Sequence, residues 1–420
     1  MLNHLSLTDE ERAMLAGEQG RGGQRALEMV VALARLYGAA DLVPIKSAQV
    51  SGVSYANIGD AGLEFLSQWA DEGACVRVPA MLNPAGMDLR AWQEMGTPAE
   101  FAEKQLAVIA AYERMGVRPT CTCAPYLLDE CASLGDHLAW SESSAVAYAN
   151  SVLGARSNRE GGPSALAAAI VGRTGNYGLL LDEGRLPTES FLARAPLRTV
   201  ADWGALGAIV GRASRGVPFI TLADETIQTL RVSEAGRAFV DADTRDGLRS
   251  LGAAAAATGS VGLFHLAGVT PEARLGLVHA PDDAPQVIET LDQAWAFLDG
   301  EVERLDLVAI GCPHASLEQV QAVASYLGGK RLAVPLWLMV SRQVADLAQQ
   351  SGLAPALEAA GGRLVADTCV VVAPLKAMGV RAVATDSAKA ACYLPGHQGV
   401  QVRFGDWERC LAAALRGEWR

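Results

Sequence analysis

Short apolar segments alternate with helix-like segments along most of this chain, and that alternation limits the folds open to it. Strand-like apolar runs lie at 42–45, 75–78, 217–222, 261–265, 307–310, 332–340 and 380–385. Helical patterns separate several of them, for example at 24–37, 98–115, 317–327 and 341–350. Strands that alternate with helices pair in parallel, because each helix carries the chain back to the starting edge of the sheet. We therefore expect an α/β fold with parallel or mixed sheets flanked by helices.

Local sequence signals predict where some helices and connections lie. The polar stretch from Ser6 to Glu11 predicts the capped start of a helix that runs through Leu15. For the helix 98–115 we expect Thr97 as the cap and Pro98 at the first position. The segment 179–199 has few periodic residues and reads as an irregular connection. A boundary near 200 then gives two predicted regions, 1–200 and 201–420.

Composition excludes some classes of protein. With 420 residues, half of them hydrophobic, the chain can bury the cores of two or three domains. A formal net charge of −12 argues against a general nucleic-acid binder. No apolar stretch of about 18 residues lacks charges and turn formers, so no membrane span is expected. No signal peptide is visible, so we expect reduced cysteines and a cytoplasmic location.

Three of the eight cysteines lie in separate turn-like contexts. These are Cys123 in Thr-Cys-Ala-Pro, Cys312 in Gly-Cys-Pro-His and Cys369 in Asp-Thr-Cys-Val. Their wide spacing rules out a local two-cysteine clip. Two of them follow an apolar run, where ligand-binding loops gather in open α/β sheets. Three thiols converging from distant loops would suit an iron–sulfur cluster, with His314 as a neighbour; the alternative is three unrelated buried cysteines.

Several polar loops could bind a ligand. Arg156 and Arg159 form a fork suited to a carboxylate or a phosphate, although a solvated loop explains them equally well. Glu142 could act as a general acid or base or orient a metal-bound water, but a lone acid among serines is also a common helix cap. Ser47, Ser54 and Tyr55 lie in a loop predicted to follow the strand 42–45, where hydroxyls often satisfy their own backbone.

These loops together resemble the aconitase X family. The resemblance rests on Thr-Cys-Ala-Pro-Tyr at 122–126, Gly-Cys-Pro-His at 311–314 and Asp-Thr-Cys at 367–369. It extends through 47–55, 59–66, 140–143, 150–159, 161–164, 172–174 and 385–389, so it spans nearly the whole chain. It implies an aconitase-like multidomain α/β fold, hydro-lyase activity and an iron–sulfur cluster, either 2Fe-2S or 4Fe-4S.

The resemblance also implies roles for individual residues. Cys123, Cys312 and Cys369 would hold the cluster, and Glu142, Ser387 and Lys389 would be catalytic. The residues that would bind substrate are Ser47, Ser54, Tyr55, Asn83, Arg156, Asn158, Arg159, Arg173 and Thr174. Two positions depart from the family pattern: Gln49 stands where His is frequent, and Asp386 stands where Asn is frequent.

The chain resembles only the large part of the family. We therefore expect a separate small swivel-domain subunit that supplies the group removing the substrate proton. Two hydroxy acids are candidate substrates, cis-3-hydroxy-L-proline and mevalonate 5-phosphate. The lysine-poor composition favours a bacterial source and hence the first of them. An iron-sensing RNA-binding protein is the alternative from another class, and the acidic charge balance counts against it.

Overall fold

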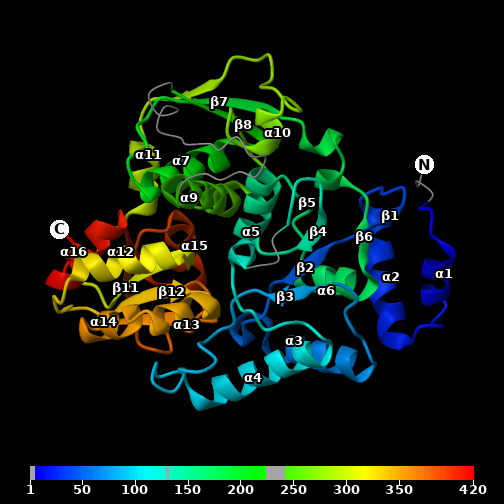
Figure 1. Cartoon of the computed structure of the whole chain (residues 1–420), viewed down its shortest axis with the longest axis horizontal. Helices are drawn as coiled ribbons and strands as arrows, with labels where there is room; N and C mark the ends of the chain where they lie inside the picture. Colours follow the sequence, from blue (N-terminus) through cyan, green and yellow to red (C-terminus); the bar gives the residue numbers. More distant parts are fainter. Residues whose placement is uncertain (1–4, 129–131, 224–241) are drawn as a thin grey trace.

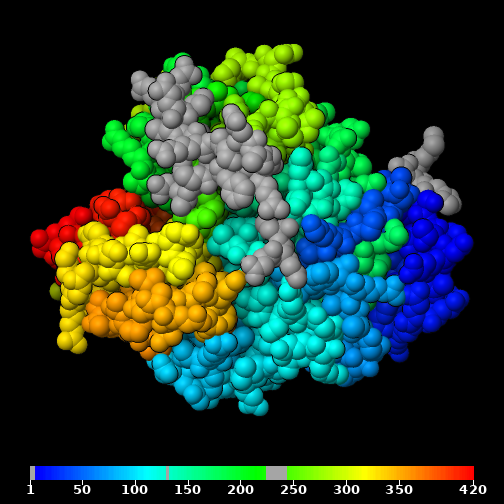
Figure 2. Space-filling view, viewed as in Figure 1, coloured from blue at the N-terminus to red at the C-terminus, as the bar shows by residue number. Residues whose placement is uncertain are grey.

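The computed structural model describes residues 5–128, 132–223 and 242–420, and within them the chain forms parallel sheets flanked by helices. Figure 1 shows the sheets in three lobes, blue through cyan to a first green at the N-terminal end, green to yellow-green in the middle of the chain and yellow to red at the C-terminal end. The three lobes touch one another in the space-filling view (Figure 2). The α/β fold with flanking helices is confirmed.

The first lobe is built on a four-stranded parallel sheet in the order β3 (Ala80–Leu82), β2 (Ser47–Val50), β4 (His137–Trp140), β5 (Arg156–Ser157). A short antiparallel pair, β1 (Leu42–Pro44) and β6 (Arg173–Gly175), lies beside it. Its helices are α1 (Asp9–Leu15), α2 (Arg21–Leu36), α3 (Tyr55–Asp71), α4 (Ala99–Arg114), α5 (Ser143–Tyr148) and α6 (Gly162–Val171). Helices α2 and α6 share one hydrophobic core with β2.

The second lobe holds another parallel sheet, in the order β10 (Gln286–Ile288), β7 (Glu189–Ala193), β8 (Pro218–Leu222), β9 (His265–Leu266). Its helices are α7 (Val200–Ala213), α9 (Ala242–Gly259), α10 (Pro271–Arg274) and α11 (Asp292–Leu298). Helices α7 and α9 pack backbone against backbone, since a Cβ on Gly207 would lie 2.3 Å from the Leu251 carbonyl oxygen. Only glycine allows that approach.

The third lobe contains a five-stranded parallel sheet in the order β13 (Gly362–Ala366), β12 (Leu336–Val340), β11 (Leu307–Ala315), β14 (Ala382–Thr385), β15 (Gln401–Phe404). Its helices are α12 (Leu317–Leu327), α13 (Arg342–Gln350), α14 (Leu353–Ala359), α15 (Ala388–Gln398) and α16 (Trp407–Arg416). The chain adds β12 and β13 on one side of β11 and then returns to add β14 and β15 on the other side. Such a reversal point opens a crevice at the carboxyl ends of the two strands.

Buried polar contacts join the lobes. Arg185 is fully buried and makes a bidentate pair with Glu272, with Nε to Oε1 at 2.6 Å and Nη2 to Oε2 at 2.7 Å. Its second Nη2 contact reaches the carbonyl oxygen of Asn150, 3.0 Å away in the first lobe. Replacing one member of a buried pair leaves an uncompensated charge, so this contact fixes the second lobe on the first.

Several sequence-based expectations hold and others are wrong. The helix at 317–327 is found as expected, and Thr8 caps α1 in a capping box with Glu11. Pro98 is itself the N-cap of α4 rather than its first residue. The segment 75–78 is not a strand, because the strand begins at Ala80. Ser47 begins the buried strand β2 and does not lie in a loop.

The segment 179–199 is also more regular than expected. It contains β7, which pairs with both β8 and β10. Charged residues and prolines flank this strand, so the sequence around it shows no clear apolar periodicity. The division into regions 1–200 and 201–420 stays a prediction. Within the described residues, no helix has both the length and the apolar character needed to cross a membrane.

Candidate active site

Two sheet-reversal points supply the acidic and basic groups of the candidate site. In the first lobe the reversal lies between β2 and β4, and Glu142 follows directly after β4. In the third lobe it lies between β11 and β14, and Lys389 follows β14 in the first turn of α15. Both residues therefore stand at the carboxyl edge of a parallel sheet, where ligands bind in open α/β folds.

Glu142 and Lys389 join these two edges through a buried ion pair. The Lys389 ammonium donates a short hydrogen bond to Glu142 Oε1 and a second, 3.3 Å long, to Ser144 Oγ. Ser144 Oγ and the Ala145 backbone N–H donate to Glu142 Oε2 at 2.5 and 2.7 Å. Glu142 is thus the N-cap of α5, which was one of the two roles expected for it. The same carboxylate also contacts Lys389.

The pair stays ionised in spite of its burial. Burial raises the pKa of the Glu142 carboxyl, but the Lys389 charge and the hydrogen bonds outweigh it and hold that pKa below its ordinary value. Burial lowers the pKa of the Lys389 ammonium, and Glu142 and the nearby thiols reverse the effect and raise it. The site therefore keeps a fixed negative and a fixed positive group side by side near neutral pH.

The three predicted cysteines converge beside this ion pair. Cys123, Cys312 and Cys369 are 4%, 8% and 7% exposed, and all three are free thiols. Each thiol lies within electrostatic range of the other two and of Lys389. Ser387, which caps α15, hydrogen-bonds the Cys312 sulfur. All six residues predicted as cluster ligands or catalytic groups therefore share one buried region.

Three thiols are the kind of donor set that an iron–sulfur cluster takes. Burial raises the pKa of the Cys123 and Cys369 thiols, and that of Cys312 to about 12, while the Lys389 charge opposes this shift at each of them. Among the described residues, no three His, Cys, Asp or Glu side chains lie close enough to bind one metal ion.

Two predicted substrate-binding residues lie next to the cysteine loops. Ser54 is buried, and its hydroxyl donates to the carbonyl oxygen of Val372, 3.1 Å away in the turn that begins at Cys369. Asn83 follows β3, and its side-chain oxygen is buried with no hydrogen-bond partner. The loop after Asn83 runs beside Cys369, since Ala85 bridges to Thr368. An unsatisfied buried oxygen at this place is suited to a ligand donor.

The predicted arginines do not join this group. Arg156 begins β5 opposite His137, at the amino edge of the sheet, and contacts Asp182 and the Leu180 carbonyl oxygen. Arg173 lies in β6 and contacts Glu11 at 3.4 Å. Glu142 follows the carboxyl end of β4, so Arg156 lies at the opposite edge of that sheet, and Arg173 belongs to the separate β1–β6 pair.

The remaining predicted substrate ligands contact the chain's own groups. Arg159 is exposed, with the Ala256 carbonyl oxygen 3.5 Å away. The Asn158 amide donates to the Tyr177 carbonyl oxygen and accepts from the Leu179 N–H, both at 2.9 Å. The other three hydroxyls contact side chains: Thr174 Oγ1 donates to Glu160, Ser47 Oγ accepts from Trp140 and Tyr55 donates to Asp60.

His314 and the two residues that depart from the family pattern lie around the three cysteines. The His314 ring, expected only as a cluster neighbour, lies between Thr122 and Thr368. Gln49, one of the two departures, donates through Nε2 to the Thr122 carbonyl oxygen at 3.0 Å. Asp386, the other departure, lines a small cavity with Cys312, and burial raises its pKa to about 7. The hydrogen bonds join residues 54 to 192 positions apart in the sequence, so no local pattern could have indicated them.

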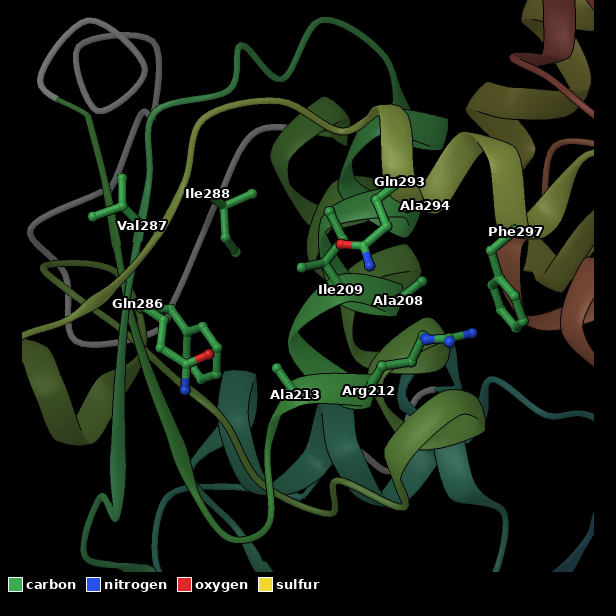
Figure 3. A pocket seen from close by; sticks show the side chains of 11 residues that line it. Ala208, Ile209, Arg212, Ala213, Gln286, Val287, Ile288, Gln293, Ala294 and Phe297 are labelled. Atoms are coloured by element: carbon green, nitrogen blue, oxygen red, sulfur yellow. The ribbon is translucent and has the colours of Figure 1, made fainter.

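A larger cavity lies away from this site, in the second lobe. It measures about 400 Å³ and is lined by residues of α7, β10 and α11. The Arg212 guanidinium lies over the Phe297 ring there, 4.2 Å from its centre (Figure 3). None of the predicted site residues lines it.

Comparison with known proteins gives consistent matches along the chain. The family models described as aconitase X first, second and third domain match residues 4–183, 187–294 and 305–416. The phosphomevalonate dehydratase large subunit of Methanothermobacter thermautotrophicus is 45% identical over 94% of this chain and 96% of its own length. The cis-3-hydroxy-L-proline dehydratase of Pseudomonas aeruginosa is 38% identical over 97% of this chain but only 69% of its own length.

A solved structure has the same fold. The crystal structure of Thermococcus kodakaraensis aconitase X, in a holo-form, matches 97% of this chain and all of that chain. Its TM-score is 0.85 at 43% sequence identity.

Proposed function

Because the chain belongs to the aconitase X family and is a hydro-lyase of the dehydratase type, we propose that it dehydrates a β-hydroxy carboxylate at the region around Cys123, Cys312 and Cys369. The observation that carries this proposal is the convergence of three free, buried thiols on the Glu142–Lys389 ion pair. Distant loops bring these groups to the carboxyl edges of two sheets, as a reaction centre requires.

The proposed cofactor is an iron–sulfur cluster held by the three cysteines. When bound, its open iron would supply a Lewis acid that eases departure of the substrate hydroxyl. The Lys389 ammonium compensates the negative charge that thiolates bring into a buried region. Ser387 donates to the Cys312 sulfur and would stabilise that thiolate further.

Glu142 is suited to accept or orient a proton rather than to release one. Its low pKa keeps it a carboxylate at neutral pH, so it can orient a water or hydroxyl through Oε1. Lys389 holds the proton of the pair and fixes the carboxylate in place. The group that removes the proton next to the substrate carboxylate is proposed to lie on a separate small subunit.

Two substrates share the required chemistry. Mevalonate 5-phosphate and cis-3-hydroxy-L-proline both carry a hydroxyl at the carbon β to a carboxylate, so loss of water involves the same bonds. The curated relatives support the first as the leading proposal, because phosphomevalonate dehydratase large subunits reach 45% identity and match this chain in length. The second remains a candidate through relatives that are 38% and 33% identical.

The comparisons also support the proposed partner. Several relatives of matching length are named large subunits, whereas this chain spans 69% of the cis-3-hydroxy-L-proline dehydratases. The part of those dehydratases that this chain does not match has roughly the length of one small domain. We propose that a separate small subunit completes the enzyme.

Ser54 and Asn83 are the proposed substrate ligands with the strongest structural support, since both lie beside the Cys369 loop. The other seven predicted positions remain proposals, and their present contacts lie within the chain.

An anaerobic measurement tests the cofactor and its ligands. The chain is coexpressed with its small subunit, and iron, acid-labile sulfide and absorbance are measured for wild type and for Cys123→Ser, Cys312→Ser and Cys369→Ser. We expect each of these variants to lose the cluster and Cys75→Ser, at an exposed position, to retain it. Full iron and sulfide in all three variants would show that other residues hold the cluster.

The substrate is tested on the same preparation. Turnover of mevalonate 5-phosphate and of cis-3-hydroxy-L-proline is compared at equal enzyme concentration, with the large chain alone as control. We expect turnover of the phosphate compound only when both subunits are present. Turnover of hydroxyproline alone would assign the second reaction, and full activity of the isolated chain would refute the role of the small subunit.

A further inference from the structure

His314 contacts the loops of all three candidate cluster cysteines, and every polar group it has is engaged. We propose that His314 is a positioning residue that holds the three cysteine loops in the arrangement the cluster needs. The proposal rests on the cofactor proposed above. It is independent of which hydroxy acid is the substrate.

The two ring nitrogens of His314 join two of the loops. Nε2 lies 2.9 Å from the carbonyl oxygen of Thr368, the residue before Cys369. Nδ1 lies 3.1 Å from Oγ1 of Thr122, the residue before Cys123. His314 itself lies two residues after Cys312 on the extended strand β11. One imidazole, carried by β11, therefore contacts the side chain of Thr122 and the backbone of Thr368, in two segments far from it in the sequence.

The partners determine which nitrogen carries the proton. A carbonyl oxygen only accepts, so Nε2 donates to Thr368 and Nδ1 accepts from the Thr122 hydroxyl. The Thr122 oxygen accepts in turn from the Ala124 backbone N–H at 3.1 Å. Every donor in this chain of contacts meets an acceptor, so the arrangement specifies one ring orientation.

The backbone of His314 adds two contacts. Its N–H donates to the Cys123 sulfur at 3.3 Å. Its carbonyl oxygen accepts from the buried guanidinium of Arg249 on α9, which also donates to the Tyr126 hydroxyl at 3.3 Å. An N–H directed at a cluster sulfur stabilises negative charge there, so this bond would affect the cluster's reduction potential.

These contacts argue against His314 as a metal ligand. The ring is fully buried, and neither nitrogen is free to bind iron without breaking a hydrogen bond. A histidine that follows a cysteine by two residues is an obvious candidate ligand from sequence alone. The structure assigns it to the supporting layer around the cysteines, where such residues orient ligands and tune the metal.

The chain contains matched controls. His265 is also fully buried, and its Nε2 also lies 2.9 Å from a carbonyl oxygen, that of Arg185 in another part of the fold. Thr368 presents its backbone carbonyl to His314, while its hydroxyl is buried with no hydrogen-bond partner. Thr122→Val therefore removes the hydroxyl that contacts His314, and Thr368→Val removes a hydroxyl that makes no hydrogen bond.

The experiment uses the complex of both subunits, loaded with iron and sulfide anaerobically. For each variant, iron and sulfide content, the electron paramagnetic resonance spectrum, the midpoint potential and the half-life of the cluster under a chelator are measured. We expect His314→Leu to shorten that half-life at least tenfold and to change the spectrum. Thr122→Val should shorten it severalfold, while Thr368→Val and His265→Gln should match wild type in spectrum and potential.

Two further variants separate the two ring contacts. His314→Gln places an amide donor near the former Nε2 and should partly restore the bond to Thr368, whereas His314→Asn places an acceptor near the former Nδ1. Each should give a longer half-life than His314→Leu. If His314→Leu fails to fold, these two variants and Thr122→Val decide the matter.

Wild-type spectrum, potential and half-life in the His314 variants and in Thr122→Val would overturn the proposal. A wild-type complex that binds no iron and sulfide would instead refute the proposed cofactor itself. The two failures are therefore distinguishable.

Discussion

The Glu142–Lys389 ion pair allows a quantitative prediction for Lys389→Met. Both side chains are less than 10% exposed, so water replaces little of the lost interaction. The substitution leaves the Glu142 carboxylate buried with hydrogen bonds from Ser144 and Ala145 but without a cation. Removing one partner of a buried pair costs about 3–5 kcal/mol. A pair at this depth should also be insensitive to salt.

The exposed pair between Lys104 and Asp60 is the control. Its nitrogen and oxygen atoms are 2.9 Å apart, but the side chains are 40% and 74% exposed. Exposed pairs contribute about 0–1 kcal/mol, so Lys104→Met should have little effect. The two substitutions remove the same group from pairs that differ mainly in burial.

Native-state hydrogen exchange is the suitable assay, because it reports the opening free energy of α5 and α15 without requiring one global transition. A double-mutant cycle with Glu142→Gln isolates the pairwise contribution. We expect Glu142→Gln to lower the opening free energy less in the Lys389→Met background than in wild type. The difference between these two effects, which is the coupling free energy of the pair, should be about 2–3 kcal/mol.

The pH dependence of the stability loss in Lys389→Met gives a further check. The pKa of Glu142 is lowered in the folded chain, so its contribution is present above the unfolded pKa and is lost as the pH falls through the folded value. In Lys389→Met the carboxyl can take up a proton as the pH falls from 7 toward 4, which relieves the destabilisation. The difference from wild type should shrink over that range. A loss below 1 kcal/mol at pH 7, with no coupling in the cycle, would refute the reasoning.

Three other outcomes are expected. Arg185→Met should weaken the junction of the first two lobes by about 3–5 kcal/mol in chemical denaturation, because its pair with Glu272 is buried. Arg194→Met, in an exposed pair, should cost under about 1 kcal/mol. Equal effects of the two substitutions would contradict the role of burial. Gly162→Ala places a Cβ 2.2 Å from a backbone carbonyl oxygen and should cost about 1–3 kcal/mol, whereas Gly161→Ala meets nothing closer than 3.7 Å and should be nearly neutral by thermal denaturation. In the cluster-free chain, a thiol reagent followed by mass spectrometry should label exposed Cys75 faster than the buried Cys123, Cys312 and Cys369, and equally fast labelling of these three would show that the site is open.

Local patterns in the sequence were enough for much of the fold. The alternation of strand-like apolar runs with helical patterns predicted parallel sheets. Both kinds of pattern can be recognised from neighbouring residues alone. The helix at 317–327 and the capped helix start between Ser6 and Glu11 were found for the same reason. The strand β7 was missed because charges and prolines flank it, and 75–78 was wrongly expected to be a strand because a short apolar run does not specify one.

The candidate site was only partly accessible from the sequence. The contexts of Cys123, Cys312 and Cys369, together with the family resemblance, identified three residues that the fold brings together. The two-arginine spacing suggested a ligand fork around Arg156, yet the arginine contacts Asp182 at the opposite edge of the sheet. Spacing along the chain gives side-chain chemistry but not the edge of the sheet on which a side chain emerges.

The sequence by itself therefore determined which residues could supply thiols, charge and helix caps, because these depend on residue type and near neighbours. Only the tertiary structure decided that Glu142 meets Lys389 and that His314 lies between Thr122 and Thr368. Such contacts join strand ends from separate sheets, and their geometry follows from strand order and lobe packing. No local pattern carries that information, since the free energy that holds these groups together comes from burial across the whole fold.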